Sequence, residues 1–211
     1  MAMIQHSMTI VKEGVAYVNH NQTPVITMDY PLFIIVKQIQ WEKADLYGEE
    51  KYVVMMGGLH LEMASLKMVG HRLDKSGWDS ALVQANIITR RRADGILKTA
   101  HITRSHYAHQ VSACALYILQ RKAYKEFTAG HESSNIAFET WVQEKSDDHL
   151  HFQFCATVLE FELTILEPVR SIREGNFQLF VEAFCKLAPW MFALDLTNYS
   201  RWLLQYTYEI C

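Results

Sequence analysis

The sequence predicts an α+β protein that is mostly helical, with a small N-terminal β/α layer of two to four strands packed on a larger C-terminal helical region. Short apolar and β-branched runs alternate with turn residues between residues 8 and 58. Two of these runs are each followed by a helical pattern, an order typical of an α/β layer. From residue 78 onward, apolar residues recur at helical spacing. We therefore expect a strand-and-helix portion over 1–77 and a helical region over 78–211, packed as one unit because no flexible linker divides them.

The strand-and-helix portion is predicted to begin with extended chain. The segment MTIVKEGVAYVNHNQTPVITMD (8–29) favours two or three strands, with turns at 13–14 and 19–23. Its last run, PVITM (24–28), is continuously apolar, which predicts an interior strand. A helix is expected from Pro31 onward, with Asp29 near its N-cap. KYVVMM (51–56) predicts a second interior strand, and LHLEMASLKMVGHRL (59–73) predicts the helix after it.

The helical region is predicted from apolar residues that recur on one side of each segment. Pro168 is expected to kink or end the helix that contains it. The expected helices cover 78–88, 95–127, 137–145, 149–175, 177–193 and 196–210.

Bulk composition narrows the class of protein. Half of the residues are apolar and 20% are charged, which fits a packed globular chain rather than a disordered one. The formal net charge of −3 gives no general attraction to nucleic-acid phosphates. Local clusters of basic residues are nevertheless candidates for binding nucleic acid. The N-terminus lacks the pattern of a signal peptide, and the apolar runs are too short to cross a membrane. We expect an intracellular protein, nuclear or cytoplasmic, whose four distant cysteines are buried, reduced thiols.

Asp29 is the sharpest candidate for chemistry. A carboxylate at the C-terminal end of an interior parallel strand lies where open α/β sheets bind their ligands, and hard divalent cations prefer oxygen ligands. His60 follows the second predicted strand and would lie near Asp29 if the strands are neighbours, as a metal ligand or a general base. The simpler alternatives are that Asp29 only caps a helix and that His60 bonds a backbone carbonyl. Under either alternative, Gly57 and Gly58 permit a close backbone approach at this corner.

A second set of candidates is basic. Arg90, Arg91 and Arg92 precede the helix expected around residue 100. Arginine suits phosphate, so this cluster predicts a nucleic-acid-binding surface with DNA as the expected partner. A solvated surface with ion pairs is the alternative. The expected helix adds the basic residues His101, Arg104, His106 and His109. His101 and His109 are two turns apart and share a face, and Arg104 is close to that face.

Two polar sets lie nearer the C-terminus. Glu160 and Glu167 share one helix face and Glu162 lies on another, so one of them would supply a third metal-binding carboxylate, unless all three face solvent. The aromatic-rich stretch PWMFALDLTNYSRWLLQY (189–206) is expected either to dock the last helix around a structural polar network or to bind a protein partner. The residues expected in that network are Asp195, Asn198 and Arg201.

Five stretches of the chain resemble a family of multicopy, mobile-element-derived, uncharacterised proteins of animal genomes, with related segments in fungal domains of unknown function. Their order and spacing match over most of residues 24–208. The stretches are VITMDYPLFIIVKQIQW, MMGGLHLEMASLKMVGHRLDKSGW, HITRSHYAHQVSACAL, FQFCATVLEFELTILEPVRSIREGNFQLFVEAFCKL and PWMFALDLTNYSRWLLQY.

The order of an Asp-ended strand, a Gly-Gly-x-His corner and a helical region is also similar to transposase cores of the RNase H-like (DDE) kind. This resemblance implies that Asp29 matches a metal-binding Asp and His60 the corner histidine, with Mg²⁺ or Mn²⁺ as the cofactor. Two departures from the family pattern weaken the prediction of enzymatic activity. Tyr30 stands where the family pattern has Gln, and Glu13 is the only acidic residue before Asp29. The sequence therefore predicts a truncated, catalytically inactive fragment of a transposon-derived nuclease. A non-enzymatic helical interaction module and a nucleic-acid-binding domain are the alternatives.

Overall fold

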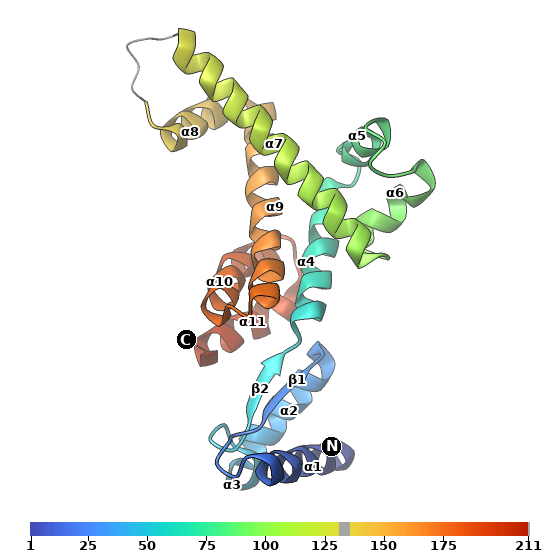
Figure 1. Cartoon of the computed structure of the whole chain (residues 1–211), viewed down its shortest axis with the longest axis vertical. Helices are drawn as coiled ribbons and strands as arrows, with labels where there is room; N and C mark the ends of the chain where they lie inside the picture. Colours follow the sequence, from blue (N-terminus) through green and yellow to red (C-terminus); the bar gives the residue numbers. More distant parts are fainter. Residues whose placement is uncertain (131–135, 211) are drawn as a thin grey trace. The chain divides into compact units, whose positions relative to one another are not determined.

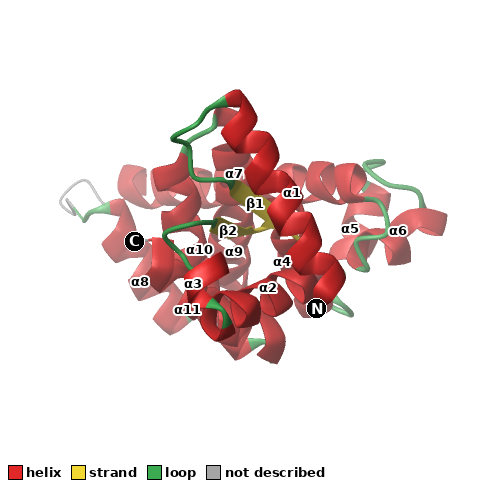
Figure 2. Ribbon diagram, turned by 90° about the horizontal axis from the view of Figure 1, so that it is seen from below, coloured by secondary structure: helices red, strands yellow, loops and turns green. Residues whose placement is uncertain are grey.

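The computed structural model describes residues 1–130 and 136–210 of the chain. Helices make up most of these residues, and β1 (Val25–Met28) and β2 (Val53–Met56) form the only sheet among them (Figure 1, Figure 2). This confirms the predicted α+β, mostly helical class. The chain divides into two compact units, Met1–Leu61 and Glu62–Cys211, whereas the sequence predicted a boundary after residue 77. No helix in the described ranges combines the length and the apolar character that crossing a membrane requires.

The first unit is built around a β–α–β crossover. β1 and β2 are parallel, in a register that pairs Val25 with Val53 and Met28 with Met56. The connection between them contains α2 (Tyr30–Glu42) and the single-turn α3 (Ala44–Tyr47). A parallel pair needs a crossover of this kind, and the register places the C-terminal ends of both strands at the same edge. α4 (Gly58–Leu73) begins directly after β2.

The N-terminal segment is helical, so the prediction of strands before residue 23 is wrong. α1 (Ala2–Val18) turns one face, which includes Ile4, Met8 and Val15, toward the unit. The carbonyl oxygen of buried Met8 accepts a hydrogen bond of 3.3 Å from the hydroxyl of Tyr52. Ile10 is 54% exposed. A preference for strands expresses the fit of a side chain to a half-buried sheet surface, and here no such surface receives this segment.

The second unit is centred on α9 (Leu150–Glu174). This helix packs against α7 (Ile102–Gly130), α8 (Phe138–Asp148) and α10 (Phe177–Ala193), and α10 also packs against α11 (Thr197–Ile210) (Figure 1). The rings of Phe161 and Trp190 stack with their centroids 4.5 Å apart and join α9 to α10. α9 continues through Pro168 and ends at Gly175, where a φ of 63° is the left-handed conformation that suits glycine.

Two short helices, α5 (Trp78–Gln84) and α6 (Arg90–Leu97), precede α7. The sequence predicted one helix over 78–88 and the start of the long helix at 95. The chain instead turns at Asn86 and again at Thr99, which both have positive φ. A small core of Leu82, Ile96 and Ala108 joins α5, α6 and α7. These two turns make α6 a separate element that displays its own surface.

α4 and α6 approach each other closely. A Cβ atom added to Gly70 in α4 would lie 1.9 Å from the carbonyl oxygen of Leu97 at the end of α6. Only glycine fits at this crossing, because the obstructing atom belongs to the backbone. The position of α6 is therefore fixed from α4 as well as from α5 and α7.

Three cysteines are on the surface, so the prediction of buried thiols is wrong for them. Cys114, Cys155 and Cys185 are all exposed, and Cys211 lies outside the described residues. In α7 the neighbouring Ala113 is buried. One residue further along, a helix has turned by about 100°, which carries Cys114 to the solvent side.

Candidate functional site

The C-terminal ends of β1 and β2 lie side by side. The sequence analysis selected this place, where each strand turns into a helix, as the candidate site. The amide of Gly57 donates a hydrogen bond of 2.7 Å to the carbonyl oxygen of Met28. A Cβ atom on Gly57 would lie 2.9 Å from that same oxygen, so the contact requires glycine. Asp29 and His60 follow the ends of adjacent parallel strands, as expected. The close approach across the corner explains Gly57 without any chemistry.

Asp29 acts structurally at this corner. Its Oδ1 accepts a hydrogen bond of 3.2 Å from the amide of Leu32, which makes Asp29 the N-cap of α2. His60 is exposed in the first turn of α4. Within residues 1–130 and 136–210, no group of three or more His, Cys, Asp or Glu side chains is arranged to hold a metal ion. Coordination of Mg²⁺ or Mn²⁺ by Asp29 therefore stays a prediction from the resemblance.

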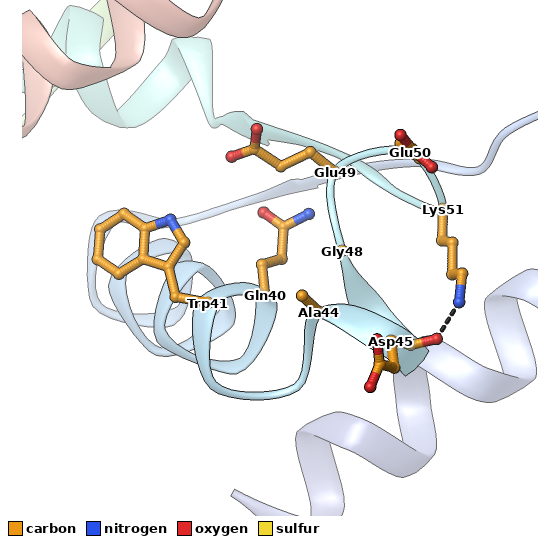
Figure 3. A pocket seen from close by; sticks show the side chains of 8 residues that line it. All are labelled: Gln40, Trp41, Ala44, Asp45, Gly48, Glu49, Glu50 and Lys51. Carbon is orange, nitrogen blue, oxygen red and sulfur yellow. Dashed lines mark hydrogen bonds between the residues drawn. The ribbon is translucent and has the colours of Figure 1, made fainter.

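The first unit also contains a hollow of about 580 Å³ beside the loop that leads into β2 (Figure 3). Figure 3 shows its three carboxylates pointing in different directions, and the Lys51 ammonium donates a hydrogen bond to the backbone carbonyl of Asp45. Such divergent charges do not surround one ligand atom. The lining residues are Gln40, Trp41, Ala44, Asp45, Gly48, Glu49, Glu50 and Lys51.

The arginines of the predicted basic cluster are exposed on the second unit. Arg90, Arg91 and Arg92 occupy the first turn of α6, and Arg104 lies in the first turn of α7, which packs against α6. All four side chains are exposed. We call these four residues the arginine surface. None of them forms an ion pair with any residue that the structure describes, whereas Lys98 nearby pairs with Asp94 at 2.8 Å.

The arginine surface lies in the most basic part of the chain. Residues 67–104 contain eight Lys and Arg residues and three Asp residues, a formal net charge of +5. The rest of the chain therefore carries −8, since the whole chain carries −3. A weakly acidic total thus conceals a strongly basic segment.

His106 and His109 do not belong to this surface, although the sequence placed His109 on a basic face with His101. His101 is exposed, but His106 and His109 are buried and each faces a glutamate. His106 pairs with Glu62 of α4. Nδ1 of His109 lies 2.8 Å from Oε2 of Glu162 in α9, and both side chains are 0% exposed. These pairs connect α7 to α4 and to α9.

Burial dominates the electrostatics of both pairs. It raises the pKa of Glu162, an effect that the hydrogen bond to His109 partly offsets. Burial also raises the pKa of Glu62, while the nearby Arg173 guanidinium lowers it. The pKa of His106 is lowered by burial first, and then by Arg173 and His109. In each group the buried environment disfavours the charged form.

The buried pairs were missed because the sequence pattern did not mark them. Glu162 was considered only as a metal ligand or a solvent-facing residue. The available signal was its place among apolar neighbours, since Phe161 and Ile165 on the same helix are buried. Glu160 is exposed, and Glu167 instead pairs with Lys186 at 2.8 Å.

The C-terminal polar residues do not form a buried network. Asp195, Asn198 and Arg201 are all exposed. Asp195 has a φ of 56° and lies in the turn between α10 and α11. The last helix docks instead through apolar and aromatic residues, among them the buried Leu203 and Tyr206.

One comparison with known proteins gives a match. A family model described as a domain of unknown function (DUF8702) matches residues 1–168. Comparison with curated proteins and comparison with solved structures gave no match.

Proposed function

Because the chain belongs to the family described as a domain of unknown function (DUF8702), we propose a function from its own surface: it binds nucleic acid through the arginine surface. The observation that carries this proposal is the placement of Arg90, Arg91 and Arg92, unpaired with any described residue, in the first turn of α6.

Three cations at this place oppose the electrostatics of the helix. The N-terminus of an α-helix carries a partial positive charge, so cations there are unfavourable and anions are favourable. The N-cap residue, Thr89, makes no side-chain cap hydrogen bond to the first turn of α6. Three arginines in the first turn therefore destabilise the isolated helix. An anion bound at the start of α6 would offset this effect and would explain why the arginines are there.

Phosphate is the anion that this arrangement suits. Guanidinium groups bind phosphate oxygens with paired hydrogen bonds, and amides in the first turn of a helix add donors of the same kind. Arg104 extends the set to the start of the next helix. Several exposed arginines along one surface match a run of phosphates better than a single small anion. A duplex DNA backbone is therefore the expected partner.

The test measures binding of a fluorescein-labelled duplex DNA of random sequence by anisotropy at several salt concentrations. The wild-type protein is expected to bind, with an affinity that falls as salt rises. Replacing Arg90, Arg91 and Arg92 together by alanine should weaken binding. The slope of log K against log salt should shrink by about 2.7, roughly 0.9 for each lost phosphate contact.

A charge-matched variant provides the control. Lys122→Ala, Lys125→Ala and Arg170→Ala together remove three exposed cations of the same unit that lie outside the basic segment. Their loss should leave the salt slope near that of the wild type. Equal weakening in both triple variants would mean that net charge alone attracts DNA, and affinity unchanged by salt would refute the proposal outright.

A second proposal concerns ancestry. We infer that the chain derives from an RNase H-like nuclease of a mobile element and no longer cuts DNA. The parallel register of β1 and β2 supports this, since it brings Asp29 and His60 to the same end of the sheet.

The ancestral reaction is tested by incubating supercoiled DNA with the protein in millimolar Mg²⁺ or Mn²⁺. We expect no cleavage, and calorimetry should detect no heat of metal binding that depends on Asp29. Cleavage that disappears in Asp29→Ala would contradict the loss of activity and would restore the metal site.

A further inference from the structure

The second unit contains a buried acid–base pair that binding through the arginine surface does not use. His109 and Glu162 are both 0% exposed, and Nδ1 of His109 lies 2.8 and 2.9 Å from the two carboxylate oxygens of Glu162. A buried group is costly in any state that leaves a charge uncompensated. The packing of α7 against α9 at this point therefore depends on how many protons the pair holds.

The pair contacts the helix that leads to the arginine surface. The indole of Trp78, the first residue of α5, stacks on the imidazole of His109 with ring centroids 4.9 Å apart and planes inclined by 20°. Nε1 of Trp78 also donates a hydrogen bond of 2.7 Å to the hydroxyl of Ser112 on α7. α5 in turn shares the core of Leu82 and Ile96 with α6. A continuous series of contacts thus joins Glu162 to α6.

We propose that the contacts from Trp78 through His109 to Glu162 form a protonation-dependent latch, which fixes α5 and α6 and thereby controls how the arginine surface meets nucleic acid. The effect on nucleic acid rests on the proposed function. The latch itself is testable without any ligand.

The charge on the pair sets the direction of the effect. With two protons the pair is neutral overall, and loss of one leaves a net negative charge in the core. Burial raises the pKa of Glu162 above its usual 4.5. A group whose pKa is raised in the folded state stabilises that state at low pH, and this stabilisation is lost as pH rises through the raised pKa. The latch is therefore expected to loosen as the pH increases above 4.5.

Neighbouring titratable groups change the stability of this region with pH in both directions. The test must therefore separate the effect of Glu162 from theirs. Glu62 on α4 has a pKa raised by burial and acts with Glu162. His106 on α7 has a pKa lowered by burial, so its stabilising effect is present above pH 6.5 and is lost as pH falls. The charge of Arg173 on α9 acts on both groups and stays constant in this range.

Two exposed histidines would contribute to DNA binding independently of the latch. His71 and His101 belong to the basic segment. Affinities are therefore measured in a background with His71→Gln and His101→Gln.

The test follows the indole Nε1–H resonance of Trp78 by NMR between pH 5 and 8 in the absence of nucleic acid, with Trp78→Phe identifying the signal. Glu162→Gln keeps the size of the side chain and removes its titration. Glu160→Gln makes the same change at an exposed position of the same helix and serves as the matched control. We expect the resonance to titrate in the wild type and in Glu160→Gln, and to shift much less with pH in Glu162→Gln, where Glu62 and His106 remain. Duplex affinity should fall with rising pH by at most about tenfold per pH unit, the limit for one proton.

Two outcomes overturn the latch: a Trp78 resonance that ignores pH in the wild type, or one that responds equally in Glu162→Gln. If circular dichroism shows that Glu162→Gln is unfolded, the carboxyl ¹³C signal of Glu162 in the wild-type protein is followed instead of the variant. That signal must share its midpoint with Trp78, and a different midpoint refutes the latch. A Trp78 titration with no duplex binding at any pH supports the latch and overturns the proposed function.

Discussion

At the scale of single residues, the environment of a carboxylate decides what it does. Asp29 is half-buried at the start of α2, where its side chain accepts a hydrogen bond from a backbone amide. Glu162 lies inside the second unit and shares a hydrogen bond with the imidazole of His109. The first role needs an oxygen atom, whereas the second depends on charge and protonation. Substitutions that keep shape but remove charge separate the two.

Asp29→Ala is expected to lower the free energy of unfolding by about 1 kcal/mol, because the amide of Leu32 loses its acceptor. Asp29→Asn retains an acceptor oxygen at the cap and should remain close to the wild type. Chemical denaturation measures both variants. Equal losses in the two would show that the charge of Asp29, rather than its capping bond, stabilises the fold.

At the scale of elements, α6 is the helix whose position matters most. It is short, it carries three like charges in its first turn, and its sequence alone would not keep it helical. Its neighbours compensate through the apolar core with α5 and α7 and through the close crossing with α4. Changes at that crossing should therefore act on the whole helix.

Gly70→Ala tests this crossing. The added methyl group meets the backbone oxygen of Leu97, so we expect a loss of about 1–3 kcal/mol, the usual range for overpacking. Gly14→Ala in α1 is the matched control, since nothing lies within 4 Å of the added atom. That variant should gain up to about 1 kcal/mol from helix propensity. Thermal unfolding of both variants measures these changes in stability. A Gly70→Ala variant more stable than the wild type would mean that α4 and α6 are not closely packed at this crossing.

The elements that could be predicted are those whose pattern is local. Both strands and the N-cap at Asp29 follow from periodicity, turn residues and capping. The sequence expected α9 to kink or end at Pro168, but the helix continues to Glu174. α1 was not predicted, because β-branched residues suggest strands only where a sheet can receive them. The breaks at Asn86 and Thr99 were not predicted either, since neither residue is the glycine that usually marks a left-handed turn.

At the scale of the whole molecule, the distribution of charge is more informative than its sum. A net charge of −3 predicts no attraction to phosphate, but residues 67–104 carry +5. The sequence identified the arginines of this segment as candidates, and the structure shows that their side chains are exposed. It did not separate them from His106 and His109, because burial depends on packing between α4, α7 and α9 that no local pattern encodes. The candidate arginines were thus predictable, while the buried His–Glu pairs were not.

The exposed cysteines have a practical consequence. Cys114, Cys155 and Cys185 stand on α7, α9 and α10, the three helices that make up much of the second unit. Nitroxide spin labels or fluorescent dyes attached to pairs of these thiols would report separations between the helices by electron paramagnetic resonance or energy transfer. The native chain therefore already contains the attachment points for following rearrangements of its helices in solution, provided that it is kept under a reducing agent until it is labelled.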